Sequence, residues 1–347
     1  MVVPGSIPKI MRSVLVLNFR IIVVMQSSKN ISFILKFVIV VLALWFMYQK
    51  VFANENLSEM YQWFLSTFKQ QTSWSLVFVL LLMFFNWLLD SIKWKFLIKK
   101  EEEVSLWLSI KAVFLGITVS IFTPNRIGEF GGRVFCLEKA DRIKAVLITI
   151  LGNMGQLLAT TIFGTLALVH YVQAYSGFLD GDADYWFFIL VFIAVILVST
   201  LIALYLNVSW LSSFFMKFKF LSKYEEYSDV FSYYSTTELL YVIFLSCARY
   251  VVFSFQFYIL LHFFQVDISL LESLTMSSLL FLTISIIPTI ALTEIGVRGS
   301  IAIYFFGLVS ANHIGILTAT FALWFTNLVL PALLGTILVY NLKFFRK

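Results

Sequence analysis

Long apolar runs divide this chain, and they constrain its fold more than any other feature of the sequence. A helix needs about 20 apolar residues to cross a hydrocarbon core of roughly 30 Å. Six runs meet this requirement: 31–52, 74–97, 145–172, 185–206, 238–264 and 315–341. A membrane β-barrel would instead show alternating strands of about ten residues. Since 61% of the chain is hydrophobic and 13% is charged, against about 25% charged in soluble domains, we predict an all-α multi-pass integral membrane protein.

Two further apolar segments are interrupted by proline and do not fit a simple crossing. Residues 105–142 contain Pro124, and residues 270–311 contain Pro288, which a polar break over 289–300 follows. Irregular backbone at membrane depth is tolerated only where protein or a water-filled cavity covers it. We therefore predict about six full spans plus two re-entrant segments, each of which enters and leaves on one side of the membrane.

The distribution of charge orients these segments. Lys and Arg gather in 9–29, 93–100, 217–223 and 343–347, and acidic residues fill other loops, including 178–184. All basic stretches fall on one side if the six runs cross and the two broken segments return, which is the pattern of a cytoplasmic face. This arrangement predicts a cytoplasmic N-terminal segment over 1–30, a single transmembrane domain over 31–341 and a basic cytoplasmic tail over 342–347.

The two broken segments share a motif. One reads SIFTPNRIGEFGGR and the other reads SIIPTIALTEIGVRGS, and each carries Glu-x-Gly-x-Arg after its proline. The motif residues are Glu129, Gly131 and Arg133 in the first segment and Glu294, Gly296 and Arg298 in the second. Because the charge pattern has the two segments entering from opposite sides, we predict an inverted repeat. Paired interrupted helices of this kind point to a transporter site near the bilayer midplane.

The residue types in the motif favour an anionic ligand. Glu and Arg four residues apart share one helical face, exposed helix N-termini favour anions, and the arginine fork matches phosphate oxygens. We expect Arg126, Arg133 and Arg298 to bind an anionic headgroup, with Glu129 and Glu294 orienting the arginines or receiving a cationic headgroup or a proton. The predicted supporting residues are Pro124, Gly128, Gly131, Gly296, Asn153, Gln156 and Arg249. Two ordinary interhelical loops with charged turns are the alternative.

Other polar residues within the apolar runs need partners. Arg249 is central in 238–264 and should face the protein interior, paired with Asp90, Glu129 or Glu294. Asp90 and Lys93 are three residues apart near the end of their run, and we expect a local pair at the surface. Asn153 and Gln156 share a helical face, either as contacts between helices or as part of the site.

The sequence offers little for catalysis or metal binding. Cys136 and Cys247 have no metal-ligand spacing, and Asp180, Asp182 and Asp184 suit a solvated outer loop. We expect no metal and no cofactor, and no nucleic-acid partner, because membrane topology explains the basic residues.

The run from Pro124 to Glu129, with Arg133 following, resembles the membrane domain of bacterial lysylphosphatidylglycerol synthases and related stand-alone membrane proteins. The resemblance covers roughly residues 30–341 and implies a domain in the bacterial inner (plasma) membrane that flips aminoacylated phospholipid from the inner to the outer leaflet. In the full-length synthases a soluble aminoacyl-transferase domain follows the last span, and we expect it to be absent here, since only the short basic tail over 343–347 follows. The late motif departs from the family pattern, since no acid follows Arg298 directly.

These observations favour a transporter over an enzyme. We expect a lipid translocase (flippase) that moves an anionic or aminoacylated phospholipid, or a polyprenyl-phosphate-linked lipid, between leaflets. The alternative is a membrane glycosyltransferase or other transferase acting on a polyprenyl-phosphate lipid, with Asp180, Asp182 and Asp184 as its available acids. Expected partners are membrane lipids and a separate lipid-modifying synthase or glycosyltransferase, for which this chain could also serve as a non-transporting partner.

Overall fold

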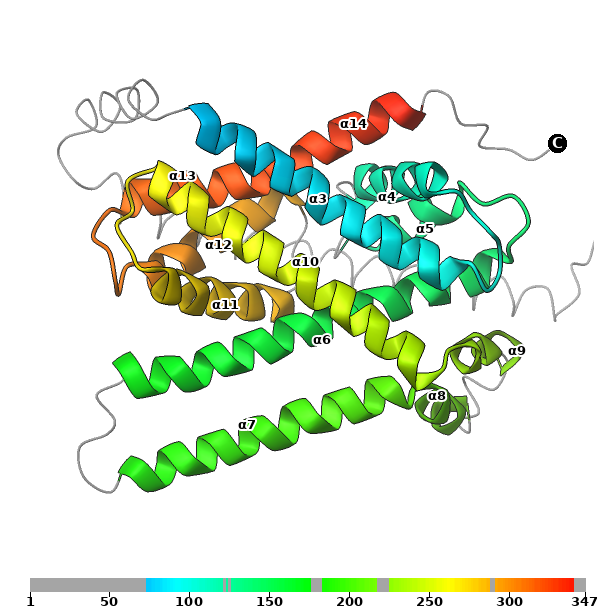
Figure 1. The fold of residues 1–347 in the computed structure, drawn as a ribbon, viewed down its shortest axis with the longest axis horizontal. Coiled ribbons are helices and arrows are strands. Elements are labelled where there is room, and N and C mark those ends of the chain that lie inside the picture. Colours follow the sequence, from blue (N-terminus) through cyan, green and yellow to red (C-terminus); the bar gives the residue numbers. More distant parts are fainter. Residues whose placement is uncertain are drawn as a thin grey trace, which may run out of the picture.

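The protein is all-helical wherever its structure is described (Figure 1). The structure is a computed structural model. The residues that it describes are 73–120, 123, 126–175, 183–216, 225–287 and 291–339. The predicted first span, 31–52, and the predicted terminal segments, 1–30 and 342–347, lie outside these ranges.

Five helices of the described part are long and apolar enough to cross a membrane. Four are continuous: α3 (Ser73–Ile98), α6 (Arg142–Tyr175), α7 (Ala183–Leu206) and α10 (Thr236–Phe263). The fifth runs from α13 (His313–Trp324) through a π-helical turn, η4 (Phe325–Val329), into α14 (Leu330–Val339). They correspond to the five predicted spans that the described residues include, so the chain is a multi-pass integral membrane protein.

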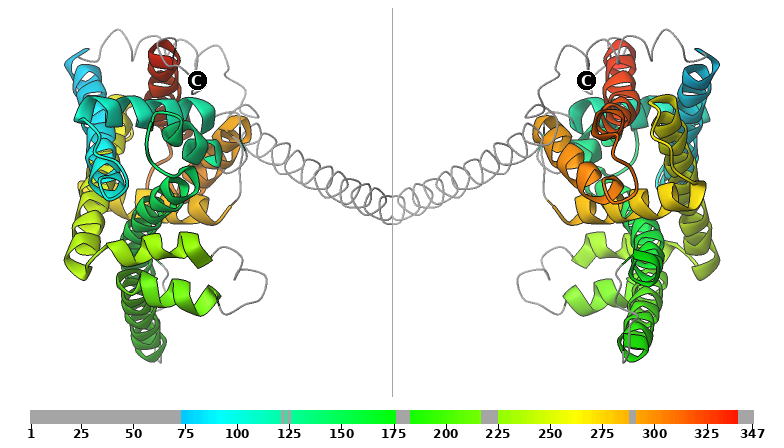
Figure 2. Two further views of the ribbon diagram at one scale, coloured as in Figure 1. Left: turned by 90° about the vertical axis from the view of Figure 1, so that its right-hand side faces the viewer. Right: turned by 90° about the vertical axis from the view of Figure 1, so that its left-hand side faces the viewer.

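The long helices form a bundle in which α3 packs along α10, and α6 packs along α7 (Figure 1). Figure 2 shows α6 and α7 on one side of the bundle, away from the last span. Large apolar side chains of α7, such as Trp186, Phe188 and Phe192, are exposed, as expected for a helix that faces lipid. Short helices α8 (Val208–Met216) and α9 (Glu225–Ser228) and the 3-10 helix η3 (Asp229–Tyr233) connect α7 to α10.

The first broken segment forms α4 (Leu106–Ser120) and α5 (Gly128–Val134), and it begins and ends at one end of the bundle. The Glu102 carboxylate, just after α3, accepts hydrogen bonds from the backbone N–H groups of Lys139 and Ala140, just before α6, at 2.7 and 2.8 Å. The start of α10 is at the same end, because the Tyr234 hydroxyl donates to the Leu97 carbonyl at 2.7 Å.

The second broken segment forms α11 (Leu270–Ile286) and α12 (Ala291–Phe306), and it begins and ends at the opposite end. The Asn312 amide, at the start of α13, donates to the carbonyls of Phe264 and Gln265, at the end of α10, at 3.2 and 2.9 Å. Figure 1 shows α4 and α5 toward one end of the long helices and α11 toward the other.

The expected polar break over 289–300 is wrong for residues 291–300, which belong to α12. The polar residues of this stretch recur at helical spacing, with Glu294 and Arg298 four apart and the Ser300 hydroxyl donating to the Gly296 carbonyl at 3.0 Å. Residues spaced three or four apart lie on one helical face, so they are compatible with a helix and do not interrupt it.

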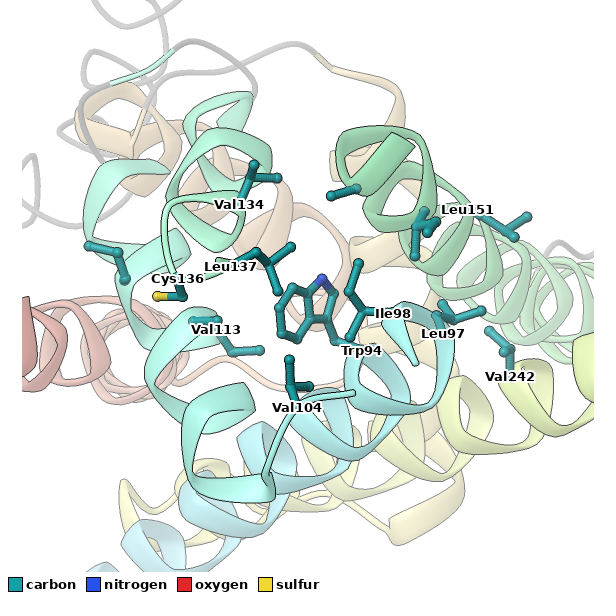
Figure 3. Close-up of a cluster of buried hydrophobic side chains, with 14 of the residues drawn as sticks. Trp94, Leu97, Ile98, Val104, Val113, Val134, Cys136, Leu137, Leu151 and Val242 are labelled. Atoms are coloured by element: carbon teal, nitrogen blue, oxygen red, sulfur yellow. The ribbon is translucent and has the colours of Figure 1, made fainter. Parts of the chain in front are cut away.

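Two apolar clusters fill the bundle. One surrounds Trp94, whose indole N–H donates to the Thr149 hydroxyl at 3.1 Å; Figure 3 shows its neighbours from α3, α4, α5, α6 and α10. The other surrounds Phe257 and Phe306, between α10, α11, α12 and α13. Each broken segment therefore packs into a cluster of its own and is held by close contact with long helices.

Glycines allow α4 and α5 to touch. A Cβ on Gly132 would lie 2.7 Å from the Gly116 Cα and 3.0 Å from the Leu115 carbonyl oxygen. Both obstacles are backbone atoms, so neither can turn away as a side chain could. Small residues at helix interfaces are the usual route to such close packing in membranes.

We expect Gly132→Ala to destabilise the protein and Gly131→Ala to be tolerated. The neighbouring Gly131 has no atom within 4 Å of an added Cβ, whereas overpacking at Gly132 should cost about 1–3 kcal/mol. Thermal unfolding of the two purified variants in detergent checks this. Equal unfolding temperatures for the two variants would show that the α4–α5 contact has no such constraint.

Candidate functional site

A buried carboxylate joins three helices at the core of the site. Asp90 of α3 is fully buried, and its Oδ1 lies 3.0 Å from Lys93 Nζ and 3.1 Å from Arg249 Nη1 of α10. Its Oδ2 accepts a hydrogen bond from Arg133 Nη2 of α5 at 2.6 Å. The expectation of a surface pair between Asp90 and Lys93 is therefore wrong. The broken segment covers this face of α3, where the Ser109 hydroxyl of α4 donates to the Ser91 carbonyl at 2.6 Å.

Arg133 connects this carboxylate to Glu129. Its Nη2 also donates to Glu129 Oε1, which confirms the predicted pairing on one face of α5. Arg133 is 2% exposed, and a Cβ on Gly116 would lie 2.9 Å from its Cγ. The glycine of α4 thus leaves room for the arginine side chain.

Arg249 is held on several sides. Its Nε donates to Asn86 Oδ1 at 3.1 Å, and its Nη1 reaches both Asp90 and Gln156 Oε1, the latter at 3.5 Å. Its guanidinium carbon lies 4.6 Å from the centre of the Trp87 ring, a geometry in which cation–π attraction contributes. The predicted pairing of Arg249 with Asp90 is confirmed.

Carboxamides extend this network to the last span. Asn86 Nδ2 donates to Asn327 Oδ1 at 3.2 Å, Asn327 Nδ2 donates to Gln256 Oε1 at 2.8 Å, and Gln256 Nε2 donates to the Val79 carbonyl at 2.9 Å. Asn327 lies in η4, four residues before Pro331. Pro331 has no N–H and would clash with the carbonyl four residues earlier in a regular helix, which explains the local π-helical winding.

This carboxamide chain was not predicted from the sequence. The available signal was the presence of Asn86 and Asn327 inside apolar runs, with Asn86 and Asp90 four residues apart on one face of α3.

A cavity of about 360 Å³ lies beside the network and receives side chains from both broken segments. Arg126 and Glu129 come from the first segment, and Arg298 comes from α12 of the second. Arg126 has a positive φ of 58°, a left-handed conformation that is uncommon outside glycine. The other polar lining residues are Asn86, Asn153, Gln156, Thr160, Arg249, Ser285 and Asn327.

The rest of the cavity wall is apolar and largely aromatic. It includes Trp87, Tyr250, Phe253, Phe281 and Trp324. The Tyr250 ring stacks on Phe163 with centroids 4.5 Å apart, and Phe253 and Phe281 pack at 5.0 Å. The cavity is therefore lined by both charged and aromatic side chains.

The structure brings together six of the predicted site residues at this cavity. Those that line it are Arg126, Glu129, Arg298, Asn153, Gln156 and Arg249. Arg133 lies behind the wall and contacts Glu129 from there.

The glycines of the two motifs belong to helices. Gly128 and Gly131 lie in α5, and Gly296 lies in α12. Gly128 is closely packed, since an added Cβ would lie 2.7 Å from the Val119 carbonyl oxygen, whereas the space beside Gly131 is open.

Several of the predicted residues lie outside the part of the chain that the structure describes. Pro124, Asp180 and Asp182 lie outside the described residues, and so does the side chain of Glu294. Asp184 lies in the first turn of α7, and its side chain is likewise outside the described residues. Within the described ranges, no group of three or more His, Cys, Asp or Glu side chains could hold a metal ion.

We expect Asp90→Asn to destabilise the protein strongly. The amide would remove the negative charge that Lys93, Arg133 and Arg249 share, and an unpaired buried charge costs about 3–5 kcal/mol. Thermal unfolding in detergent measures the loss, with Glu138→Gln, an exposed carboxylate in the α5–α6 connection, as the matched control. An Asp90→Asn protein as stable as this control would contradict the role of the carboxylate.

Comparison with known proteins identifies the family. Residues 33–335 match the family described as the lysylphosphatidylglycerol synthase TM region, a membrane domain implicated in lipid translocation. The match spans most of the chain, both motifs included, and does not extend to a synthase domain. Neither the curated proteins nor the solved structures gave a match. The chain belongs to the lysylphosphatidylglycerol synthase TM-region family, as the resemblance carried by residues 124–133 predicts.

Proposed function

We propose that this protein is a lipid translocase that binds a phosphate-containing headgroup in the cavity and moves it between leaflets. The observation that carries the proposal is the meeting of the two broken segments: Arg126 and Glu129 of one and Arg298 of the other line a single cavity.

The charge of the cavity wall supports an anionic ligand. The described lining residues include three arginines, Arg126, Arg249 and Arg298, beside the carboxylate of Glu129. Arginine also presents its donors in a planar fork that matches phosphate oxygens.

The access route supports a lipid over a free phosphate compound. Leu157 of α6 lines the cavity and is 51% exposed on the protein surface. Ser285 of α11 also lines the cavity and is exposed. The cavity thus reaches the bundle surface beside α6 and α11. A headgroup could enter there while its hydrocarbon chains remain in the bilayer or against the aromatic wall.

The chain path supports alternating access. The first broken segment starts and ends beside Glu102, and the second starts and ends beside Asn312, at opposite ends of α10. We propose that the segments are inverted re-entrant repeats of a bacterial inner-membrane protein with both termini in the cytoplasm. Each segment would then open the cavity toward one leaflet.

The geometry suggests a division of roles. Arg126 and Arg298 would bind the phosphate, and Glu129 would orient the arginines around it. Arg133 would act from behind the wall by fixing Glu129, in place of the direct headgroup contact expected from the sequence. The substrate would be an anionic or aminoacylated phospholipid or a polyprenyl-phosphate-linked lipid. Membrane lipids and a separate lipid-modifying synthase or glycosyltransferase would be its partners.

We expect Arg298→Ala and Glu129→Gln to slow translocation of a fluorescent anionic phospholipid in proteoliposomes. A hydrogen bond to a charged group is worth about 1.5–3 kcal/mol, so loss of Arg298 should reduce the rate about 10- to 100-fold. The measurement is the rate at which labelled headgroups become accessible to an impermeant quencher.

Arg142→Ala and Glu138→Gln are matched controls, because both side chains are exposed and neither lines the cavity. Unfolding temperatures of all four variants separate loss of transport from loss of fold. Wild-type rates for Arg298→Ala and Glu129→Gln would refute the assignment of the cavity as the translocation site.

A further inference from the structure

The last span is interrupted near its middle, whereas α3, α6, α7 and α10 are continuous helices. In its π-helical turn, η4, the Leu330 N–H donates to the Phe325 carbonyl, five residues earlier, and Pro331 has no N–H to donate. Two of the other prolines in the chain, Pro124 and Pro288, lie in the broken segments. Because helices bend at prolines and at π-helical turns, bending at η4 costs less than bending elsewhere in this span.

The last span also changes neighbours at this turn. Before it, α13 packs against α10 and against α12 of the second broken segment; after it, α14 packs against α4 of the first (Figure 1). Leu323, in the last turn of α13, belongs to the apolar cluster around Phe257, whereas Leu328 of η4 belongs to the cluster around Trp94. The turn therefore divides the span between the two broken segments.

Backbone contacts fix α14 to α4. The Thr118 hydroxyl of α4 donates to the Ala332 carbonyl of α14 at 3.0 Å. A Cβ on Gly335 of α14 would overlap the Phe114 carbonyl oxygen of α4. Helices packed this closely move together, because the packed atoms leave no space for one to shift against the other. If α4 moves, α14 has to follow it.

Hydrogen bonds link the turn to the cavity. Asn327 of η4 lines the cavity, and its carboxamide donates to the Leu323 carbonyl at 3.1 Å and accepts from Asn86 of α3 at 3.2 Å. The Asn86 carbonyl oxygen accepts from Arg249 Nε at 3.1 Å, and Arg249 also lines the cavity. A shift of the Arg249 guanidinium is thus transmitted to the turn through two hydrogen bonds.

We propose that the π-helical turn is a hinge of the transport cycle, and that Asn327 is the positioning residue that couples the hinge to the ligand. This inference rests on the proposed function. The Arg133 pairs with Asp90 and Glu129 hold the first broken segment closed, and a ligand at Glu129 competes for that arginine. The hinge then lets α14 follow the opening segment while α13 stays with α10 and α12.

The direct test measures distances between spin labels by pulsed electron spin resonance. Labels at Phe244 of α10 and Ile337 of α14 report the movement of α14, and labels at Trp107 of α4 and Ile337 report the contact that should stay fixed. All three side chains are exposed. The protein is reconstituted in vesicles of phosphatidylcholine, without and with an anionic phospholipid, after alanine replaces both native cysteines.

We expect anionic lipid to change the Phe244–Ile337 distance and to leave the Trp107–Ile337 distance unchanged. Ile337 lies about 12 Å beyond the turn, so a bend of about 20° displaces it by about 4 Å. A turn that only relieves the clash at Pro331 would keep one bend in both vesicles. A single, unchanged Phe244–Ile337 distance would therefore overturn the hinge.

Variants connect the hinge to transport. Deletion of Val329 together with Pro331→Ala restores regular α-helical bonding without rotating α14, because a π-helical turn accommodates one extra residue. We expect this variant to keep a single Phe244–Ile337 distance. Its maximal translocation rate should fall about 10-fold or more, as expected where a conformational step limits the cycle, with the half-saturating lipid concentration unchanged.

Asn327→Ala should also lower the maximal rate without changing the half-saturating concentration, and its label distances should no longer respond to anionic lipid. Asn207→Ala is the matched control, because it changes an exposed carboxamide at the end of α7 that bonds only within its own helix, to the Ala203 carbonyl. It should behave like wild type. A response to lipid in Asn327→Ala equal to that of this control would overturn the coupling role.

The outcomes separate the hinge from the proposed function. Arg298→Ala should raise the half-saturating lipid concentration, in contrast to the hinge variants, and a wild-type rate for it refutes the translocation site whatever the distances show. If Arg298→Ala slows transport while the variant lacking Val329 translocates like wild type, the hinge is wrong and the site stands. Should that variant fail to fold, the wild-type distances alone decide whether the turn bends.

Discussion

The ion pairs of Asp90 determine the rest of the architecture. One buried carboxylate binds Lys93 of its own helix, Arg133 of α5 and Arg249 of α10. Removing so many charges from water is expensive, and only several good partners at once offset that cost. Because the partners belong to three helices, these ion pairs hold α5 of the first broken segment against α3 and α10.

This arrangement also places excess positive charge beside the cavity. The network pairs three cationic side chains, Lys93, Arg133 and Arg249, with two carboxylates, those of Asp90 and Glu129. Its formal net charge is therefore +1. Glu129 takes part both in this network and in the cavity wall. A ligand that approaches Glu129 therefore contacts the interactions that hold α3, α5 and α10 together. In the proposed mechanism, Arg133 would couple ligand binding at Glu129 to the position of these helices, since it pairs with both Glu129 and Asp90.

The features that follow from local physics could be predicted from the sequence. The length of the apolar runs predicts the spans that the structure describes. The four-residue spacing of Glu129 and Arg133 predicts their ion pair on one face of a helix. The cost of a charge in the membrane requires an interior partner for Arg249, and Asp90 was among its three candidates. These predictions depend on residues close in sequence or on a free-energy penalty that any fold must relieve.

The features that depend on how segments cover one another could not be predicted. Asp90 and Lys93 precede a lysine-rich stretch that is typical of a membrane surface, and only the packing of α4 and α5 encloses them. The bond between Asn86 and Asn327 joins residues 241 positions apart, beyond the reach of any periodicity. The same limit applies to Asn153, whose pattern with Gln156 fits a helix contact and a ligand contact equally well. The two roles separate only when every neighbouring acceptor and donor is accounted for. The carboxamides of Asn86, Asn327 and Gln256 complete bonds across the bundle, whereas Asn153 lines the cavity without a hydrogen bond to the described part of the chain.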